Sequence, residues 1–407
     1  MSEKSDKATF TGFGFGAIQS GLFAYEAFRS GCFGRIVIAE VMPEIVSAVR
    51  ANGGSFAVNI AGSDEVRPVV IDGVEIYNPR DPADRRKLVE AVSESSEIAT
   101  ALPSVSFYGD GSAPDHVTGI LRDGLAERVN TGKPPAVVYT AENNNHAAEV
   151  LTECLRKSGM PDPATGAAIL NTVIGKMSGV IDDSAQIERQ QLHTVTPDMQ
   201  KAFLVEEFNR ILISRIPPGG GQRHIAVFEE KDDLLPFEEA KLFGHNATHA
   251  LIGYMLAERG IVFMDMVRDF PEILAMAREA FINESGSALC RKYSGLDALF
   301  TPDGFAAYAD DLLERMMNPH LCDRVERVVR DPRRKLGWND RLIGTLRLAM
   351  SQGIDPRRFA EGAAAALRLL AKQENRAAES LLNELWPEAE EAERAVIGRM
   401  VRERGSV

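Results

Sequence analysis

The stretch ATFTGFGFGAIQSG, residues 8–21, decides the fold of the first part of the chain. A short apolar run at residues 8–14 leads into a glycine-rich turn, and the residues that follow have the apolar spacing of a helix. Gly12, Gly14 and Ala17 fill a G-x-G-x-x-A frame, in which the glycines allow a tight turn and close approach of a pyrophosphate, and the small third residue lets helix and strand pack closely. The pattern predicts a dinucleotide-binding unit; a glycine-rich turn without a cofactor is the alternative.

Glu40 bears on which dinucleotide the unit would take. It closes the next apolar run, RIVIAE at residues 35–40, where an acidic side chain can accept hydrogen bonds from the ribose hydroxyls. A carboxylate there also repels the extra phosphate of NADP, so the sequence predicts NAD as the cofactor. The spacing from the glycines exceeds the usual value of about 20 residues, which the insertion SGCFG at residues 30–34 explains.

Short apolar runs alternate with helical patterns through the first half of the chain. The strand candidates lie at residues 8–14, 35–41, 97–105 and 136–143. Amphipathic stretches at residues 17–31 and 116–130 have the apolar spacing of helices. Because this βαβ order is typical of a doubly wound parallel sheet, we expect an α/β, Rossmann-type NAD-binding domain over residues 1–195.

The character of the sequence changes after about residue 195. Long patterns with helical periodicity replace the short apolar runs. These patterns lie at residues 199–213, 236–260, 270–293, 302–317 and 359–386. We therefore expect residues 196–407 to form a mostly α-helical domain that carries the substrate and the catalytic groups.

The composition argues against several classes of protein. The chain has 407 residues, of which 44% are hydrophobic and 26% charged, values typical of two globular domains. No apolar run approaches the roughly 20 residues that span a bilayer. The charged N-terminal stretch MSEKSDKATF lacks the apolar core of a secretion signal, which predicts a cytoplasmic location. A net charge of −13 argues against a nucleic-acid partner, and monomer and dimer both stay open.

KLFGHNATH, residues 241–249, holds the groups with the clearest chemistry. His245 and His249 are four apart, as in zinc-binding helices, but Asn246 stands where such a helix carries its general-base glutamate. No nearby cysteine pair or histidine-rich segment supplies a further ligand. On a helix that turns about 100° per residue, Asn246 and His249 share a face and Lys241 lies about 80° from His249. We expect a metal-free site; polar residues that merely face solvent are the alternative.

A lysine with two asparagines suits the oxidation of an alcohol without a metal. Removing a hydride from a carbinol carbon requires that the hydroxyl proton leave as well, and a neutral lysine amine can take it. Burial or a neighbouring positive charge lowers the lysine pKa from about 10.4 toward neutrality. Amide N–H groups can then hold the developing alkoxide. Asn246 is one such donor, and Asn143, at the carboxyl end of the run 136–143, is the second.

The pattern K-x-x-x-x-N-x-x-H, filled by Lys241, Asn246 and His249, resembles the signature of the polyol-specific long-chain dehydrogenases, the zinc-independent mannitol dehydrogenase family. The resemblance extends over nearly the whole chain. It implies that Lys241 is the general base, that Asn143 and Asn246 form the oxyanion hole, and that His249 binds a substrate hydroxyl. It also implies that Arg327 binds the polyol.

The resemblance further implies what the protein acts on. The expected substrate is a small polyol or polyol phosphate, such as mannitol 1-phosphate, interconverted with a ketose such as fructose 6-phosphate. NAD would be the cofactor, and Glu238 or Glu239 would relay the proton of the lysine. A substrate phosphate would need further cations, for which the candidates are Arg291, Lys292, Arg324 and the run at residues 333–335. Each of these could equally be a solvated surface charge.

One segment departs from the family pattern. IGKMSGV, residues 174–180, stands where family members carry Asp-Arg-Ile-x-Pro, with Lys176 in the place of the arginine and no acidic partner beside it. The departure leaves the identity of the substrate open. A hexuronate reductase of the same family, and an NAD-sensing protein without turnover, are therefore the alternative functions.

Overall fold

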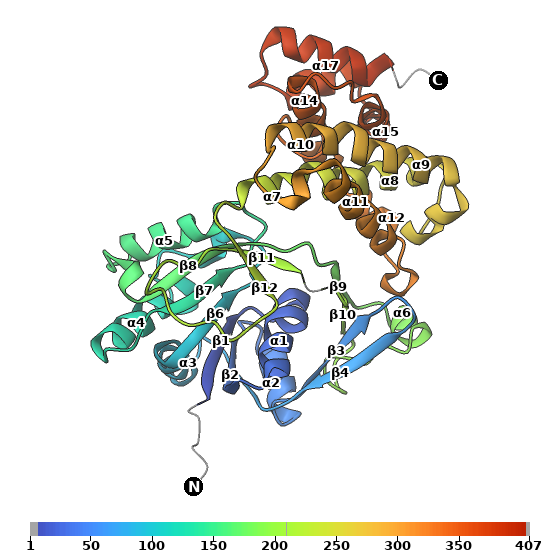
Figure 1. Cartoon of the computed structure of the whole chain (residues 1–407). Coiled ribbons are helices and arrows are strands. Elements are labelled where there is room, and N and C mark those ends of the chain that lie inside the picture. The colour runs from blue at the N-terminus through green and yellow to red at the C-terminus, as the bar shows by residue number, and fades with distance from the viewer. Residues whose placement is uncertain (1–6, 209, 404–407) are drawn as a thin grey trace. The chain divides into compact units, whose positions relative to one another are not determined.

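The computed structural model describes residues 7–208 and 210–403 of the chain. The chain divides into two compact units, Met1–Leu234 and Leu235–Val407, which run from blue to yellow-green and from yellow to red in Figure 1. Residues 1–6, part of the charged stretch from which a cytoplasmic location is expected, lie outside the described residues. No helix in the described part is both long enough and apolar enough to cross a membrane.

The first unit is built on an eight-stranded sheet, in which six neighbouring strands are parallel to one another. The six parallel strands are β1 (Ala8–Phe13), β2 (Phe33–Ala39), β5 (Val74–Tyr77), β6 (Ser95–Thr100), β7 (Ala136–Thr140) and β8 (Ala167–Val173). In space they run β5-β2-β1-β6-β7-β8, which is the 3-2-1-4-5-6 order of a doubly wound dinucleotide-binding sheet. The expected α/β fold is therefore confirmed, and all four strand candidates are present as β1, β2, β6 and β7.

Six further strands complete the first unit. β11 (Ile211–Ser214) pairs antiparallel with β8, and β12 (Phe228–Lys231) extends the same sheet parallel to β11. A second sheet of four strands has the order β4-β3-β10-β9. Its strands are β3 (Phe56–Ala61), β4 (Val66–Ile71), β9 (Ser178–Ile181) and β10 (Ala202–Glu206).

Alternating side chains of the central strands serve two cores on opposite faces of the large sheet. Phe10 and Ile38 pack into the core that includes the first helix, a π-helix η1 (Gln19–Ala24) continued by α1 (Tyr25–Ser30), and the small sheet. Val37 and Ile98 pack into the other core. The helices of that second core are α3 (Pro82–Glu94), α4 (Val117–Asn130) and α5 (Ala147–Lys157). Figure 1 shows these three helices along one side of the sheet.

Local sequence signals explain where α3 begins and where α1 ends. Asp81 accepts hydrogen bonds from Ala83 and Asp84 N–H, and Pro82 supplies a first residue with a helical φ, so α3 starts there. Gly31, with a φ of +66°, ends α1 in the left-handed conformation that glycine adopts without steric penalty. β2 can therefore begin two residues later.

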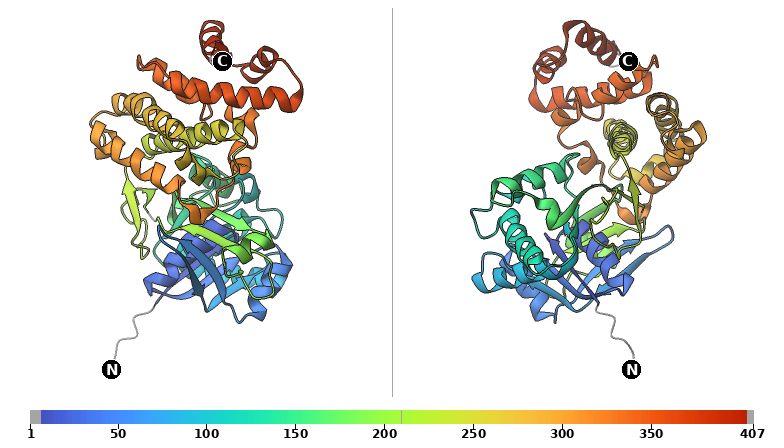
Figure 2. Two further views of the ribbon diagram at one scale, coloured as in Figure 1. Left: turned by 90° about the vertical axis from the view of Figure 1, so that its right-hand side faces the viewer. Right: turned by 60° about the vertical axis from the view of Figure 1, so that its left-hand side comes forward.

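The regular secondary structure in the described residues of the second unit is helical, apart from one isolated bridge between Phe263 and Arg324. Its α-helices are α7 (Leu235–Glu239), α8 (Ala247–Glu258), α9 (Pro271–Glu279), α10 (Ser287–Lys292), α11 (Pro302–Met316), α12 (Val325–Val329), α13 (Pro332–Lys335), α14 (Ile343–Ser351), α15 (Arg357–Glu374), α16 (Ala378–Leu385) and α17 (Glu391–Glu403). Two π-helices, η4 (Ala240–Asn246) and η6 (Ala280–Gly286), interrupt them. α8 is mostly buried and packs against α12 and α15, and Figure 2 shows these helices from two further sides.

The structure differs from the sequence expectation between residues 196 and 234. The first unit extends to Leu234 rather than to residue 195. The helix expected at residues 199–213 was wrong: the described residues there form β10 and β11. All five residues of β10 are buried, and periodicity alone does not separate a short, wholly buried strand from a buried helical segment.

Candidate active site

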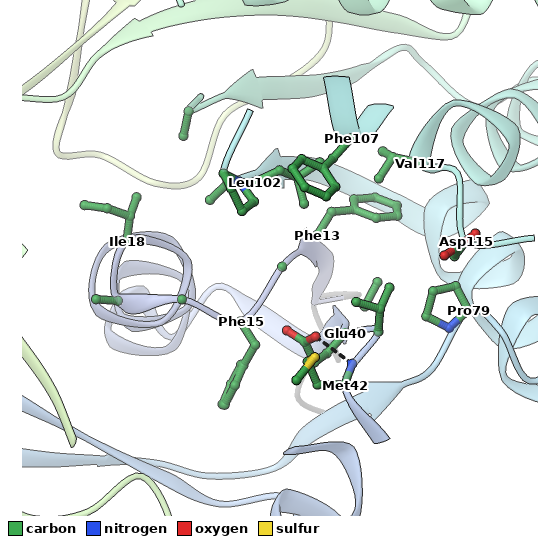
Figure 3. Close-up of a pocket in the computed structure, with 18 of the residues that line it drawn as sticks. Phe13, Phe15, Ile18, Glu40, Met42, Pro79, Leu102, Phe107, Asp115 and Val117 are labelled. Atoms are coloured by element: carbon green, nitrogen blue, oxygen red, sulfur yellow. Dashed lines mark hydrogen bonds between the residues drawn. The ribbon is translucent and has the colours of Figure 1, made fainter. Parts of the chain in front are cut away.

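A cavity of about 890 Å³ lies in the first unit at the carboxyl ends of its parallel strands. We call it the strand-end cavity. Its walls come from the turns after β1, β2, β6 and β7 and from strand β9. Among the sequence-predicted residues it brings together Gly14, Ala17, Glu40 and Asn143. Figure 3 shows Glu40 and the aromatic rings of Phe13, Phe15 and Phe107 around this space.

The glycines of the first turn have different tasks. Gly14 has a φ of +90°, and a Cβ there would lie 2.8 Å from the carbonyl oxygen of Ala101. A Cβ on Gly16, by contrast, would meet no atom within 4 Å, so the backbone at this point is open to the cavity. Gly12 is not among the lining residues; a Cβ on it would lie 2.1 Å from Nε2 of Gln19. Gly12 therefore serves the packing of strand against helix.

Glu40 directly follows β2, and one oxygen of its carboxylate accepts a backbone hydrogen bond. Its Oε1 accepts the N–H of Met42 at 2.8 Å, the contact dashed in Figure 3. Burial raises the pKa of Glu40 above its ordinary value, and backbone N–H groups, first that of Met42, offset part of this rise. The bond to Met42 fixes the carboxylate at the wall of the cavity, since both residues line it.

The strand-end cavity fits a dinucleotide. Its volume lies within the range of about 300–1,000 Å³ typical of small-molecule sites. A glycine turn with open backbone precedes a helix that starts at Ala17, the arrangement that accepts a pyrophosphate. Arg80, which also lines the cavity, is held in an ion pair with Asp115 at 2.8 Å. That arginine is therefore already paired with a carboxylate, while Glu40 presents a second carboxylate to the same cavity.

Lys241 and Asn246 lie on a π-helix rather than on the regular α-helix that the sequence predicted. α7 ends at Glu239, the π-helix η4 follows, and α8 begins at Ala247. Because a π-helix pairs residues five apart, Lys241 and Asn246 stand one turn apart on the same side. The expected angle of about 80° between Lys241 and His249 assumed a regular helix and does not hold across this turn. Asn246 and His249 remain an i, i+3 pair.

The amine of Lys241 is in the protonation range that base catalysis needs. Burial lowers the pKa of Lys241 to about 8, the nearby charge of Glu238 opposes this, and Arg341 adds to it. About a tenth of the amine is therefore neutral at pH 7, far more than for a lysine with the ordinary pKa. This is the condition that a lysine must meet to accept a proton from an alcohol.

The two histidines of KLFGHNATH have different surroundings. His245 is buried, and burial together with the charge of His249 holds its pKa well below the ordinary value. Nε2 of His249 lies 3.0 Å from Oδ2 of Asp323, at ion-pair distance but without hydrogen-bond alignment. Within residues 7–208 and 210–403, no group of three or more His, Cys, Asp or Glu side chains is placed to hold a metal ion.

Asp323 joins His249 to Arg327, and sequence reasoning did not find it. Arg327 donates from Nε to Oδ1 of Asp323 at 2.7 Å. Burial by itself would raise the pKa of Asp323, but His249 and Arg327 outweigh it and hold the pKa well below its ordinary value. The available signal was only the Asp-x-x-x-Arg spacing, because Asp323 itself precedes α12, which begins at Val325 after an extended Arg324.

Residues 233–400, which carry these groups, match the model of the mannitol dehydrogenase C-terminal domain. This match covers nearly all of the second unit, Leu235–Val407. A mannitol-1-phosphate 5-dehydrogenase of Geobacillus stearothermophilus is 27% identical over 339 residues, 82% of this chain and 79% of the relative. The enzyme of that name from Brevibacillus brevis is 27% identical over 301 residues, 73% of this chain and 70% of the relative. The family resemblance is therefore confirmed.

Two solved structures share the fold. Pseudomonas fluorescens mannitol 2-dehydrogenase, in a ternary complex with NAD and D-mannitol, has a TM-score of 0.70 and 16% identity and covers 100% of this chain and 94% of its own. A substrate-free D-sorbitol dehydrogenase has a TM-score of 0.74 and 15% identity, with 98% and 94% covered. At such identities the likeness shows the fold alone, an α/β unit followed by a helical one.

The two glutamates before Lys241 differ in their surroundings. The carboxylate of Glu239 is occupied by Lys292, whose Nζ is 2.7 Å away, and by the hydroxyl of Tyr293 at 2.7 Å. Glu238 is buried and raises the pKa of Lys241 by its charge. Of the two glutamates, Glu238 is the one that interacts electrostatically with the lysine.

The segment that departs from the mannitol dehydrogenase pattern forms part of the cavity wall. Ser178, Gly179 and Val180 lie on β9 and line the strand-end cavity. Lys176 is buried, and its ammonium donates to the backbone carbonyls of Phe208, at 2.8 Å, and Glu206. Lys176 therefore ties β9 to the end of β10.

Most candidate cations for a substrate phosphate already have partners. Arg333 pairs with Glu374 and Glu384, Arg334 with Asp331, and Lys292 with Glu239. Arg291 donates to the carbonyl of Gln352, and Arg324 lies 5.7 Å from the ring centre of Phe263. Lys335 is buried, donates to the carbonyl of Arg330, and has a pKa lowered to about 8, first by burial. Lys335 is therefore the cation of this group that differs most from a solvated surface charge.

Proposed function

We propose that this protein is an NAD-dependent, metal-independent dehydrogenase that interconverts a sugar alcohol and the corresponding ketose, with Lys241 as the general base. The observation that carries the proposal is the half-buried Lys241, whose pKa is lowered to about 8, one π-turn from Asn246 in the region that matches the mannitol dehydrogenase C-terminal domain. The relatives named mannitol-1-phosphate 5-dehydrogenase support the reaction type.

The strand-end cavity would hold the cofactor. The backbone at Gly14 and Gly16 and the helix start at Ala17 would accept the pyrophosphate, and Glu40 the ribose hydroxyls. The chemistry that bound NAD supplies is the acceptance of a hydride from the carbinol carbon. We propose residues 1–195, extended by the strands up to Leu234, as the NAD-binding part, and the second unit as the substrate-binding part.

Each of the proposed catalytic groups has one task in alcohol oxidation. The neutral amine of Lys241 takes the hydroxyl proton, and Glu238 passes it toward solvent. The amide groups of Asn246 and Asn143 donate hydrogen bonds to the oxygen as negative charge develops on it. We propose that His249 and Arg327, both of which contact Asp323, orient further hydroxyls of the polyol.

A substrate panel with purified protein tests the proposal. Mannitol 1-phosphate, mannitol, sorbitol and a hexuronate would each be offered with NAD and with NADP, in the presence and absence of a chelator. We expect NAD-linked oxidation of a polyol or its phosphate that survives the chelator, and loss of about 10²–10⁴-fold in kcat for Lys241→Ala. Lys372→Ala, at an exposed lysine of α15, is the matched control and should keep full activity.

The possible results of the panel separate the alternatives. Equal activity of wild type and Lys241→Ala would show that the lysine takes no part in the chemistry. Loss of activity in the presence of the chelator would support a metal-dependent mechanism instead. Reduction or oxidation confined to the hexuronate would identify a sugar-acid enzyme. NAD binding in calorimetry without turnover of any compound would favour a sensing role.

A further inference from the structure

Glu142 is a buried carboxylate directly behind the wall of the strand-end cavity. It is 5% exposed and follows β7 by two residues. Three neutral donors converge on it. Oε1 accepts the N–H of Leu102 at 2.9 Å, and Oε2 accepts the hydroxyls of Thr100, at 2.9 Å, and Tyr108. The carboxylate thus connects the end of β6, the turn after it and the helix η2 (Val105–Tyr108) to the end of β7.

The segments that Glu142 connects carry residues of the cavity wall. Leu102 lines the cavity itself, Phe107 directly precedes Tyr108, and Asn143 directly follows Glu142. Leu102 and Phe107 are both drawn on this wall in Figure 3. Phe107 is 58% exposed and lies in η2, whose last residue, Tyr108, is bonded to Glu142. Glu142 is not among the lining residues and can act on a ligand only through these neighbours.

The chemistry of the three donors determines which substitution is tolerated. The N–H of Leu102 can only donate, so it needs an acceptor oxygen at position 142. The hydroxyls of Thr100 and Tyr108 can rotate and accept instead. A glutamine at position 142 can therefore satisfy all three groups, with its carbonyl toward Leu102 and its amide toward the hydroxyls. An alanine removes the acceptor of all three donors, of which the hydroxyls of Thr100 and Tyr108 are buried, and each lost bond destabilises the arrangement.

We propose that Glu142 is a positioning residue that holds Asn143 and the wall formed by Leu102 and Phe107 in the geometry needed for NAD binding and alcohol oxidation. The inference rests on the proposed function, because it takes the strand-end cavity as the NAD site and Asn143 as an oxyanion donor. Its physical basis is that three hydrogen bonds to one buried group fix three chain segments at once.

The matched control is Glu97, a second buried carboxylate of the same sheet. It lies within β6, accepts the hydroxyl of Tyr139 at 2.6 Å and the N–H of Ile225 at 3.3 Å, and is not among the residues that line the cavity. Glu97→Ala therefore imposes a comparable loss of buried hydrogen bonds without touching the cavity wall. It separates a general loss of stability from a loss of positioning.

The experiment measures NADH affinity by fluorescence titration, kcat on the best polyol of the panel and Tm, in the full-length protein. We expect Glu142→Ala to weaken NADH binding at least tenfold and to lower kcat, and Glu142→Gln to stay within about threefold of wild type in both. Glu97→Ala should lower Tm while leaving NADH affinity and kcat of the folded protein unchanged. If Glu142→Ala does not fold, Tyr108→Phe, which removes one donor, takes its place with the same readouts.

A double-mutant cycle tests whether Glu142 acts through Asn143. The loss in kcat caused by Glu142→Ala should shrink at least threefold when Asn143 is already alanine, because coupled residues are non-additive. Full additivity in kcat, or NADH affinity equal in wild type and Glu142→Ala, would overturn the inference. A wild-type protein that binds no NADH would instead contradict the proposed function, so the two failures are distinguishable.

Discussion

Lys241 sets the pH range of the proposed reaction. Its pKa of about 8 means that the neutral amine, the form that accepts a proton, becomes the major species only above that pH. We expect kcat/KM for polyol oxidation to rise about tenfold per pH unit below 8 and to level off above it. Ketose reduction needs the protonated amine, so its kcat/KM should fall as the pH rises through the same range. Profiles measured from pH 6 to 10 check both signs.

The Lys241→Ala variant provides the comparison for these profiles. Its residual activity should lose the inflection near pH 8, because the variant no longer carries the amine whose pKa is lowered to that value. An inflection that persists unchanged in Lys241→Ala would assign the titration to a different group.

Asp323 is expected to matter both for substrate binding and for stability. In Asp323→Asn the ion pairs with His249 and Arg327 are lost, so the polyol KM should rise at least tenfold while NADH affinity stays constant. The pKa of Asp323 is depressed in the folded protein. Its stabilising contribution is therefore fully present above the ordinary aspartate pKa of about 3.9 and is lost as pH falls through the folded pKa.

Unfolding curves at several pH values test the stability part of this expectation. Wild type should have the larger free energy of unfolding at pH 7, and the difference from Asp323→Asn should narrow below about pH 4. Asp303→Asn, at an exposed aspartate in the first turn of α11, is the control. A constant difference between wild type and Asp323→Asn at all pH values would show that the ion pairs do not provide it.

At the scale of elements, the π-helix η4 is the feature that arranges the lysine and the asparagine. The spacing K-x-x-x-x-N does not bring two side chains together on an α-helix, where neighbours are three or four apart. A turn with i to i+5 pairing does, and such turns are frequent at functional sites. The two π-helices of the second unit also pack against each other, since η4 contacts η6.

Gly244 is a residue of η4 that packs closely against η6. A Cβ there would lie 2.6 Å from Cε2 of Phe281 in η6. Gly244→Ala should therefore displace the π-turn, with a loss of about 1–3 kcal/mol in the free energy of unfolding and at least tenfold in kcat. Thermal unfolding and steady-state kinetics measure the two effects.

A glycine elsewhere in the second unit supplies the control for Gly244→Ala. A Cβ on Gly362 of α15 would lie 2.5 Å from Cδ1 of Leu251, a conflict of similar severity outside the π-turn. Gly362→Ala should lower stability to a similar extent and leave kcat of the folded protein near wild type. Equal losses of kcat in the two variants would mean that η4 has no special role.

At the scale of the whole molecule, the net charge of −13 should influence how fast an anionic cofactor arrives. The screening length falls from about 30 Å at 0.01 M salt to about 8 Å at 0.15 M. We therefore expect the association rate constant of NADH to rise over this range, because added salt screens the repulsion. Stopped-flow fluorescence measures it, and the dissociation rate constant should change less. A falling association rate would show that local cations such as Arg80 dominate the field at the cavity.

Much of the first unit could be predicted because its information is local. A strand, a glycine turn and a helix follow each other within residues 8–21, and β1, β2, β6 and β7 each read as apolar runs. The helix prediction for residues 199–213 failed because an apolar run that is buried on all sides has no periodicity that separates a strand from a helix. β10 acquires its strand identity from pairing with β3 and β9, which lie far away in the sequence.

By itself the sequence determined the doubly wound fold, the helical second unit, the family and the set of polar groups to examine, since these depend on patterns within short stretches. Only the tertiary structure decided that the lysine sits on a π-turn, that Asp323 joins His249 to Arg327, and that Glu142 connects three segments behind Asn143. Those contacts join residues up to 74 positions apart, as the Asp323 to His249 pair shows. Burial, which also sets the pKa of Lys241, exists only once the chain has folded.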